Sequence, residues 1–198
     1  MPPKCLEIRG VGGIDLYAYE SRITGWVGTT ARVALELFVG LKRSDESEIK
    51  VWGKVLERNF PSLKAKVGFL VGDPYFNRTV SGFENLRILG GFGSSPQEEV
   101  IERYLLLVGL SADEAVATYD DSMRKRLGIV QAVMEDQQLI LLEEPFEHLV
   151  PQEKNLVKDL LLQLRDEGKT IVIVACEPCP WLEICDEIIE IKGGISDD

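Results

Sequence analysis

The sequence has no long apolar run. No stretch approaches the roughly 20 residues that a membrane-spanning helix needs, and no N-terminal apolar run follows a basic segment as in a secretory signal. Basic residues are in the minority, with 22 Lys and Arg against 33 Asp and Glu and a net charge of −11, so a nucleic-acid backbone is not expected as a partner. The four cysteines, at positions 5, 176, 179 and 185, lack the spacing of a secreted disulfide framework and fit a reducing cytoplasm.

The stretch from Leu139 to Pro145, LILLEEP, predicts a buried strand that ends in two carboxylates. In an open α/β sheet, ligands bind at the carboxyl ends of the strands. Glu143 and Glu144 could there hold Mg²⁺ and orient a water, as nucleoside triphosphatases require. The alternative is a strand that ends in solvated acids.

A helix and a second buried strand follow this acidic pair. Pro151 suits a first helical position, and Gly168 is placed to end the helix. We expect its apolar face to contain Leu156, Leu160, Leu161 and Leu164. Thr170–Ala175 (TIVIVA) predicts the next strand, which completes a βαβ unit with a parallel crossover.

Other segments define the rest of an α/β chain with one core, taken as a single domain over 1–198. The patterns predict strands at 5–11, 14–19, 48–52 and 67–71 and a helix at 31–39 closed by Gly40. Three capping boxes predict a helical region from about 81 to 118. They pair Ser81 with Glu84, Ser95 with Glu98, and Ser111 with Glu114, and the expected core residues are Val100, Leu105, Leu106 and Val108.

The chain resembles the nucleotide-binding domain of ABC transporters of the exporter type. Tyr119–Leu127 (YDDSMRKRL) is similar to the family's signature YSGGMKRRL, and LILLEEP to LLILDEP. Ile23–Gly28 (ITGWVG) resembles the strand that enters the Walker A loop. The resemblance implies a P-loop NTPase-like ABC ATPase core with a parallel sheet, a small N-terminal antiparallel β part and an inserted helical subdomain at about 81–118. In that family the subdomain faces a membrane-embedded permease subunit.

The phosphate loop departs from the family pattern. A functional loop reads G-x-x-x-x-G-K-[ST], in which backbone amides and the Lys bind phosphates and the hydroxyl reaches Mg²⁺. Alignment from the following helix leaves Gly25, Gly28, Thr29, Thr30 and Arg32 as nucleotide-binding candidates, with no lysine. Alignment from the preceding strand makes the loop about three residues shorter, and the two alignments remain open.

Other family positions also differ. Gly72 stands at the glutamine of the Q-loop and Glu177 at the switch histidine, and the signature reads Asp120, Asp121 and Ser122. An Asp or Ser at this point is a good N-cap for the helix that follows. We expect the next three residues, Arg124, Lys125 and Arg126, to form a solvated basic face.

These departures favour a pseudo-ATPase, in which Glu144 (the position of the catalytic base) and Glu143 (the position of the metal ligand) are remnants. We expect no cofactor, with Mg-ATP bound at best weakly. The predicted function is a non-catalytic subunit or scaffold of an ABC exporter-like membrane complex. It would lie in the cytoplasm, at the inner face of the membrane through the permease subunit, with a catalytically competent ATPase paralogue or as a homodimer. The alternatives are an active ATPase whose rebuilt phosphate site uses Arg32 and the glutamates, and a soluble dimeric regulatory protein unrelated to transport.

Overall fold

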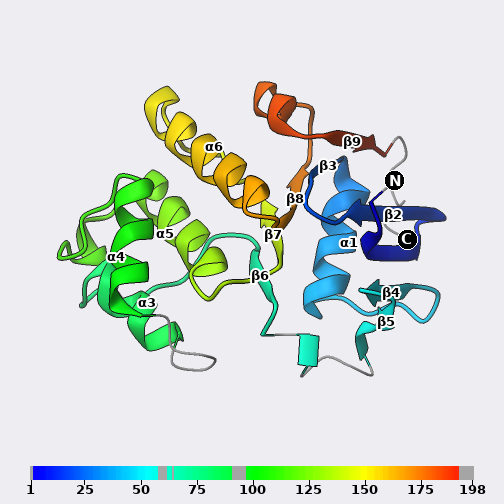
Figure 1. Ribbon diagram of the computed structural model, residues 1–198, viewed down its shortest axis with the longest axis horizontal. Helices are drawn as coiled ribbons and strands as arrows, with labels where there is room; N and C mark the ends of the chain where they lie inside the picture. Colours follow the sequence, from blue (N-terminus) through cyan, green and yellow to red (C-terminus); the bar gives the residue numbers. More distant parts are fainter. Residues whose placement is uncertain (1, 58–61, 64, 91–96, 192–198) are drawn as a thin grey trace.

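A parallel β-sheet runs through the middle of the molecule (Figure 1). The computed structural model describes residues 2–57, 62–63, 65–90 and 97–191. Within these residues the sheet has five strands in the order β6-β7-β8-β3-β9, and every neighbouring pair is parallel. Their bounds are β3 Ile23–Val27, β6 Val67–Leu70, β7 Leu139–Glu143, β8 Thr170–Ala175 and β9 Glu187–Glu190. All five strands therefore present their carboxyl ends at one edge.

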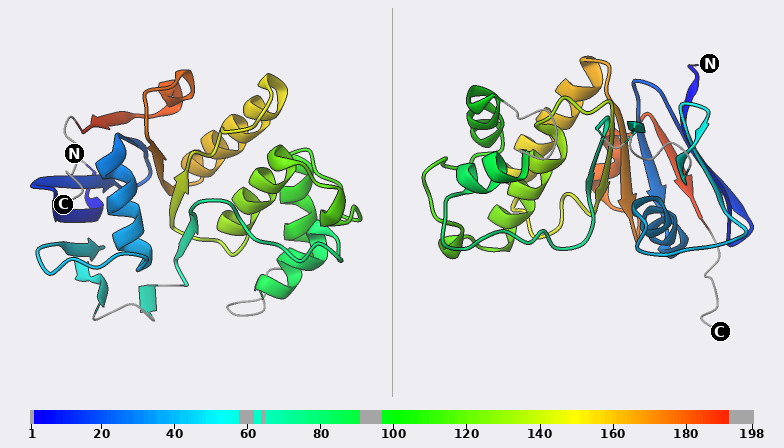
Figure 2. Two further views of the ribbon diagram at one scale, coloured as in Figure 1. Left: turned by 180° about the vertical axis from the view of Figure 1, so that it is seen from behind. Right: turned by 90° about the horizontal axis from the view of Figure 1, so that it is seen from below.

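A second, antiparallel sheet lies to one side of the parallel sheet. Its order is β2-β1-β4-β5, with β1 Lys4–Val11, β2 Ile14–Tyr19, β4 Glu48–Val51 and β5 Lys54–Val55. Helix α1, Thr29–Val39, lies between the two sheets, as the view from below shows (Figure 2). The fully buried Trp26 on β3 ties them further, because its indole N–H donates to the carbonyl of Tyr17 on β2 at 3.0 Å.

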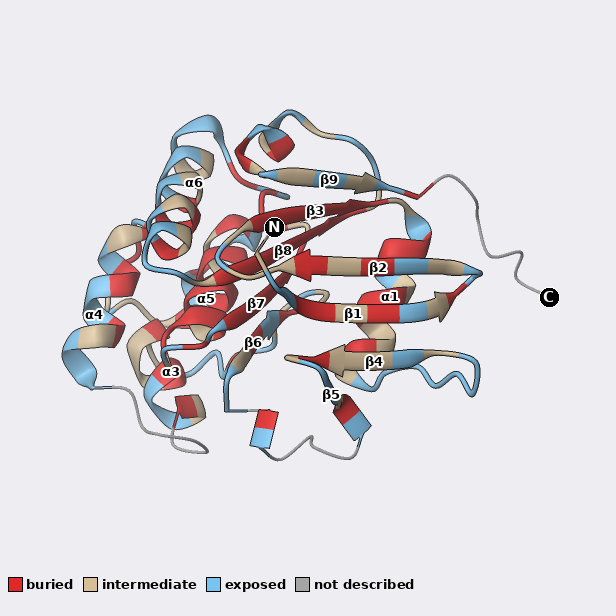
Figure 3. Ribbon diagram, turned by 45° about the vertical axis from the view of Figure 1, so that its right-hand side comes forward, coloured by how far each residue is buried: buried red, intermediate tan, exposed pale blue. Residues whose placement is uncertain are grey.

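The central strands β7 and β8 are buried along their whole length and consist mostly of apolar residues, because each has both faces covered (Figure 3). Alternate residues of a strand point to opposite faces. On β7, Leu139 and Leu141 belong to the core shared with α1 and the antiparallel sheet, whereas Ile140 and Leu142 belong to the core on the other side. This arrangement explains why LILL and TIVIVA show no alternation of apolar and polar residues.

Helices cover that other face. α5, Asp121–Val133, and α6, Pro151–Asp166, pack on the sheet, and α3, Gly82–Gly90, and α4, Glu98–Leu107, lie beyond α5 (Figure 1). Short 3₁₀ helices cover Val116–Thr118 (η1) and Pro180–Ile184 (η2). Gly68 on β6 allows α5 to approach closely, since a Cβ there would lie 1.7 Å from the Ala132 carbonyl oxygen.

The α/β class, the parallel sheet and the N-terminal antiparallel part are thus confirmed. Among the described residues, no helix combines the length and the apolar character that crossing a membrane requires. The division into one domain with an inserted subdomain at about 81–118 stays a prediction.

One predicted helix start is wrong. Residues 111–114 form no helix, and only η1 follows them. The carbonyls of Ala112 and Glu114 instead accept backbone N–H groups from the start of α3, at 3.4 Å from Phe83 and 3.2 Å from Gly82. These two carbonyls are therefore occupied by tertiary hydrogen bonds and are not available for a helix that starts at Ser111.

The other capping boxes had different outcomes. At Ser81 the cap is present, because its hydroxyl accepts from the Glu84 N–H at 3.1 Å. Ser95 lies outside the described residues.

Two leucines assigned to the core are exposed. Leu106 on α4 is 77% exposed and Leu156 on α6 is 38% exposed. Most of each predicted face is buried, including Leu105 on α4 and Leu160 on α6, and Tyr104 and Val157 are buried in addition. Leu106 and Leu156 are each next to another apolar residue in the sequence, so the apolar pattern matches more than one helical face.

Candidate functional site

The connection from β3 to α1 lies at the carboxyl edge of the sheet, where the resemblance implies a phosphate loop. β3 ends at Val27 and α1 begins at Thr29, so Gly28 alone joins them. Gly28 has φ 122°, and a Cβ on it would lie 2.8 Å from the carbonyl oxygen of Ile191. Only glycine suits this turn, and a single residue cannot form the eight-residue cradle of amides that a triphosphate needs.

Gly25 is not a loop residue. It lies in the interior of β3, where an added Cβ would meet the side chains of Leu182 at 3.1 Å and Cys185 at 3.2 Å. The alignment that begins the loop at Gly25 is therefore wrong, and the structure fits the shortened loop. Thr29 and Thr30 form the first turn of α1, where Thr29 is exposed and Thr30 is buried.

Glu143, at the end of β7, has both carboxylate oxygens engaged. The Nε atom of Arg32 on α1 lies 3.0 Å from Oε1, and the backbone N–H of Gly72 donates to Oε2 at 2.7 Å. The Glu143 side chain is only 7% exposed, and a carboxylate so buried requires such partners. Arg32 also lies 3.4 Å from Glu36, one turn further along α1.

Glu144 is tied to the neighbouring strand. Its carboxylate accepts a hydrogen bond at 2.7 Å from the backbone N–H of Cys176, which follows β8. Its own backbone N–H donates to the carbonyl of Val174 at 2.9 Å. Its φ of 43° is unusual for a residue other than glycine. Burial raises the pKa of the Cys176 thiol, and the nearby Glu144 carboxylate adds to this rise.

These contacts decide whether the site suits Mg²⁺. Among the described residues, no group of three or more His, Cys, Asp and Glu side chains could hold a metal ion. The guanidinium of Arg32 contacts the Glu143 carboxylate, at the position where the resemblance implies a divalent cation. The residues present therefore do not fit Mg²⁺.

The signature segment begins α5. Asp120 caps the helix, as the sequence predicts, and its carboxylate accepts from the Met123 N–H at 2.8 Å. This hydrogen bond lowers the pKa of Asp120. Asp121 forms an ion pair with Arg124. A carboxylate of the chain thus lies at the N-terminus of α5, where an anion such as phosphate would otherwise be favoured.

The prediction of a solvated basic face at 124–126 is wrong, because two of its three residues are buried. Lys125 is 3% exposed and Arg126 5% exposed. The Lys125 ammonium lies 3.6 Å from a carboxylate oxygen of Glu147.

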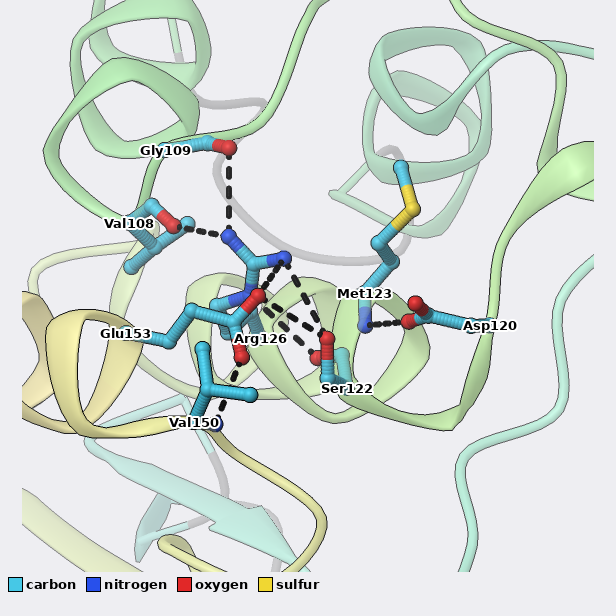
Figure 4. A network of polar contacts seen from close by, with 8 residues as sticks. All are labelled: Val108, Gly109, Asp120, Ser122, Met123, Arg126, Val150 and Glu153. Carbon is cyan, nitrogen blue, oxygen red and sulfur yellow. Dashed lines mark hydrogen bonds and ion pairs between the residues drawn. The ribbon is translucent and has the colours of Figure 1, made fainter.

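Arg126 lies at the centre of a polar network that joins three helices (Figure 4). Its guanidinium donates to the carbonyls of Val108 at 2.8 Å and Gly109 at 3.1 Å, which follow α4. It also pairs with Glu153 on α6 at 2.8 Å, and Glu153 accepts from the Val150 N–H at 2.9 Å. These partners are far from Arg126 in sequence, so the charge pattern alone could not reveal them.

The structure therefore brings Arg32 and Glu143 together and places Glu144 beside them, while Gly25 lies apart inside β3. The sequence marks both Arg32 and Glu143 as site candidates but does not predict the contact between them. The one available signal was their placement at the same edge of the sheet.

The fold and these motifs define an ABC-type nucleotide-binding domain, and the chain belongs to the ABC transporter family. The family model described as ABC transporter matches residues 21–147. Relatives of the chain include proteins named as ATP-binding proteins of transport and export systems.

Two named relatives illustrate this similarity. The bacitracin transport ATP-binding protein BcrA of Enterococcus faecalis is 25% identical over 190 residues, which cover 93% of this chain and 62% of that protein. A fluoroquinolones export ATP-binding protein of Mycobacterium tuberculosis is 26% identical over 198 residues, which cover 97% of this chain and 65% of that protein. The chain thus spans about three fifths of the length of these relatives.

Solved structures share the fold. An ATP-binding subunit of an ABC transporter has a TM-score of 0.81 at 15% identity and covers 94% of this chain and 85% of its own. A putative ABC transporter ATP-binding protein of Pyrococcus furiosus has a TM-score of 0.77 at 17% identity, over 95% of this chain and 97% of its own.

Proposed function

We propose that the chain is a non-catalytic ATP-binding-subunit homologue within an ABC exporter-like membrane complex. The observation that carries the proposal is the replacement of the phosphate loop by Gly28 alone. Phosphoryl transfer depends almost entirely on positioning and electrostatic stabilisation of the phosphoryl group. Without the loop's amides and its lysine, the triphosphate has no cradle that would hold it for attack.

Two further contacts support the loss of catalysis. Asp120 caps α5 with a carboxylate, so negative charge stands where phosphate would approach the helix. The Arg32 guanidinium, which a rebuilt phosphate site would need, is engaged by Glu143 and Glu36. Both contacts disfavour the alternative of an active ATPase.

A membrane-embedded permease subunit is the proposed partner, since relatives are named for bacitracin transport and fluoroquinolone export. In this proposal the chain lies at the cytoplasmic face of the membrane, with a catalytically competent paralogue or a second copy beside it. The helical side of the molecule has two exposed large apolar residues, Ile88 on α3 (52%) and Leu106 on α4 (77%), and Tyr75, in the segment between β6 and α3, is 93% exposed. We assign the docking surface to this side.

Calorimetry of the pure chain with Mg-ATP tests whether the chain binds nucleotide, on which the non-catalytic part of the proposal depends. We expect a Kd of about 1 mM or weaker, which corresponds to only about −4 kcal/mol. A relative with an intact phosphate loop serves as the positive control. Micromolar binding would overturn the proposal and favour the rebuilt site.

Co-purification from membranes with a membrane-embedded subunit tests the partner. We expect the chain to co-purify and the double substitution Tyr75→Ser/Ile88→Ser to weaken association. Leu41→Ser is the matched control, because Leu41 is 69% exposed and follows α1, away from the helical side. No association of the unmodified chain would favour the soluble regulatory dimer, and equal effects of the two variants would refute the assigned surface.

A further inference from the structure

We propose that the Arg32 guanidinium takes the place of the divalent cation at the carboxyl edge of the sheet. The chain would thereby keep a permanent positive charge on Glu143 and need no metal to hold this edge together. This inference concerns the chain's own residues and stands whether or not a membrane subunit is the partner.

The first argument is the state of Glu143. Its side chain is 7% exposed, and an ionised carboxylate removed from water requires a counter-charge and hydrogen bonds. Arg32 supplies the charge at 3.0 Å, and the Gly72 N–H supplies a hydrogen bond at 2.7 Å. The carboxylate is therefore compensated entirely from within the chain.

The second argument is exclusion. Mg²⁺ binds carboxylate oxygens at about 2.0–2.1 Å in near-octahedral geometry and retains several waters. A magnesium ion on Glu143 would lie within a few ångströms of the guanidinium, and two cations so close repel each other strongly in a partly buried site. Arg32 and a metal are thus alternatives at Glu143.

The third argument is connectivity. Gly72 comes after β6, Glu143 ends β7, Glu144 is bonded to Cys176 after β8, and Arg32 belongs to α1. The contacts therefore join the ends of three neighbouring strands to the helix that packs on them. On this inference, Glu143 is the anchor of a metal-free junction and not a remnant of a lost site.

Thermal unfolding of Arg32→Ser tests the inference, with MgCl₂ or MnCl₂ as the only added ligand and NaCl at matched ionic strength. Arg87→Ser is the control variant: Arg87 is 50% exposed, close to the 52% of Arg32, but its partner Glu84 is also exposed. We expect Tm to fall by about 4–10 °C in Arg32→Ser and by less than about 2 °C in Arg87→Ser. Arg32→Lys, which retains the charge, should recover at least half of the loss.

The metal response completes the test. Millimolar Mg²⁺ or Mn²⁺ should raise the Tm of Arg32→Ser by a few degrees more than NaCl, and the added change Glu143→Gln should abolish that rise. The unmodified chain should respond to Mg²⁺ no more than to NaCl.

Three outcomes would overturn the inference. They are a specific stabilisation of the unmodified chain by either metal, an Arg32→Ser variant as stable as Arg87→Ser, and a destabilised Arg32→Ser variant that neither metal rescues. If Arg32→Ser fails to fold, the inference is still tested by two measurements. They are the metal response of the unmodified chain and the Tm of Arg32→Lys. These experiments contain no nucleotide and no partner, so their failure is distinct from failure of the proposed function.

Discussion

Replacing Arg126 by Leu should destabilise the protein severely. The guanidinium is 5% exposed and contacts the Val108 and Gly109 carbonyls as well as the Glu153 carboxylate, all within 3.1 Å. Removing it leaves a carboxylate that is only 19% exposed without its counter-charge, and leaves two carbonyls after α4 without that donor. Breaking a buried ion pair from one side costs about 3–5 kcal/mol.

That loss is large against a total free energy of unfolding of about 5–15 kcal/mol. For a chain of this length, each kcal/mol lost from the free energy of unfolding lowers Tm by about 2–4 °C, so we expect Tm to fall by about 6–20 °C. Urea unfolding followed by circular dichroism gives the free energy, and thermal unfolding gives Tm.

Arg124→Leu is the matched control, because Arg124 lies on the same helix but is 37% exposed and pairs with the exposed Asp121. Its loss should cost about 1 kcal/mol or less. A second variant, Arg126→Leu with Glu153→Leu, should recover part of the loss because no buried charge then stays unpaired. If Arg126→Leu differs from Arg124→Leu by less than about 1 kcal/mol, the reasoning from the buried network is refuted.

Three further predictions concern the acidic residues and nucleotide. Glu144→Gln should leave any trace of ATP hydrolysis unchanged in a phosphate-release assay, and a hundredfold drop would show Glu144 acting as a base. Asp120→Ala should cost about 1 kcal/mol at pH 7 through the lost cap. Because the folded-state pKa of Asp120 is lowered, the stabilisation due to its charge is present above the unfolded-state pKa and is lost as pH falls through the folded value. Urea unfolding of Asp120→Asn should therefore converge with that of the unmodified chain in acid, and a constant difference would contradict this. Finally, Mg-ATP should not drive dimerisation, since its charge meets Asp120 and Asp121, and a monomer-to-dimer shift in sedimentation that requires nucleotide would be inconsistent with this.

Local patterns in the sequence sufficed for most of the fold. The central strands were predictable because LILL and TIVIVA are short apolar runs with turn signals beside them, and α6 because Pro151 and Gly168 mark its ends. β9 was not predicted, because its four residues, EIIE, show neither an apolar run nor an alternation, and only pairing with β3 makes it a strand.

The site was harder to predict because its contacts are between residues distant in sequence. Arg32, Gly72 and Glu143 were each singled out, yet nothing in the sequence shows that the first two bond to the third. The same holds for Arg126, whose carbonyl partners follow another helix. A charge in a sequence shows which interactions are available, whereas tertiary packing decides which one is made.

The turn at Gly28 has an evolutionary consequence. A single substitution cannot restore a phosphate loop, because Gly28 alone joins β3 to α1 and a substitution adds no residues to this connection. A lysine at position 31, in the first turn of α1, would enter the core, since Ala31 is fully buried. A longer connection would require an insertion and displacement of Ile191, whose N–H donates to the Val27 carbonyl at 2.8 Å. Under the proposed function, the short turn therefore acts as a ratchet: selection can refine what the chain does without a phosphate loop far more readily than it can build one.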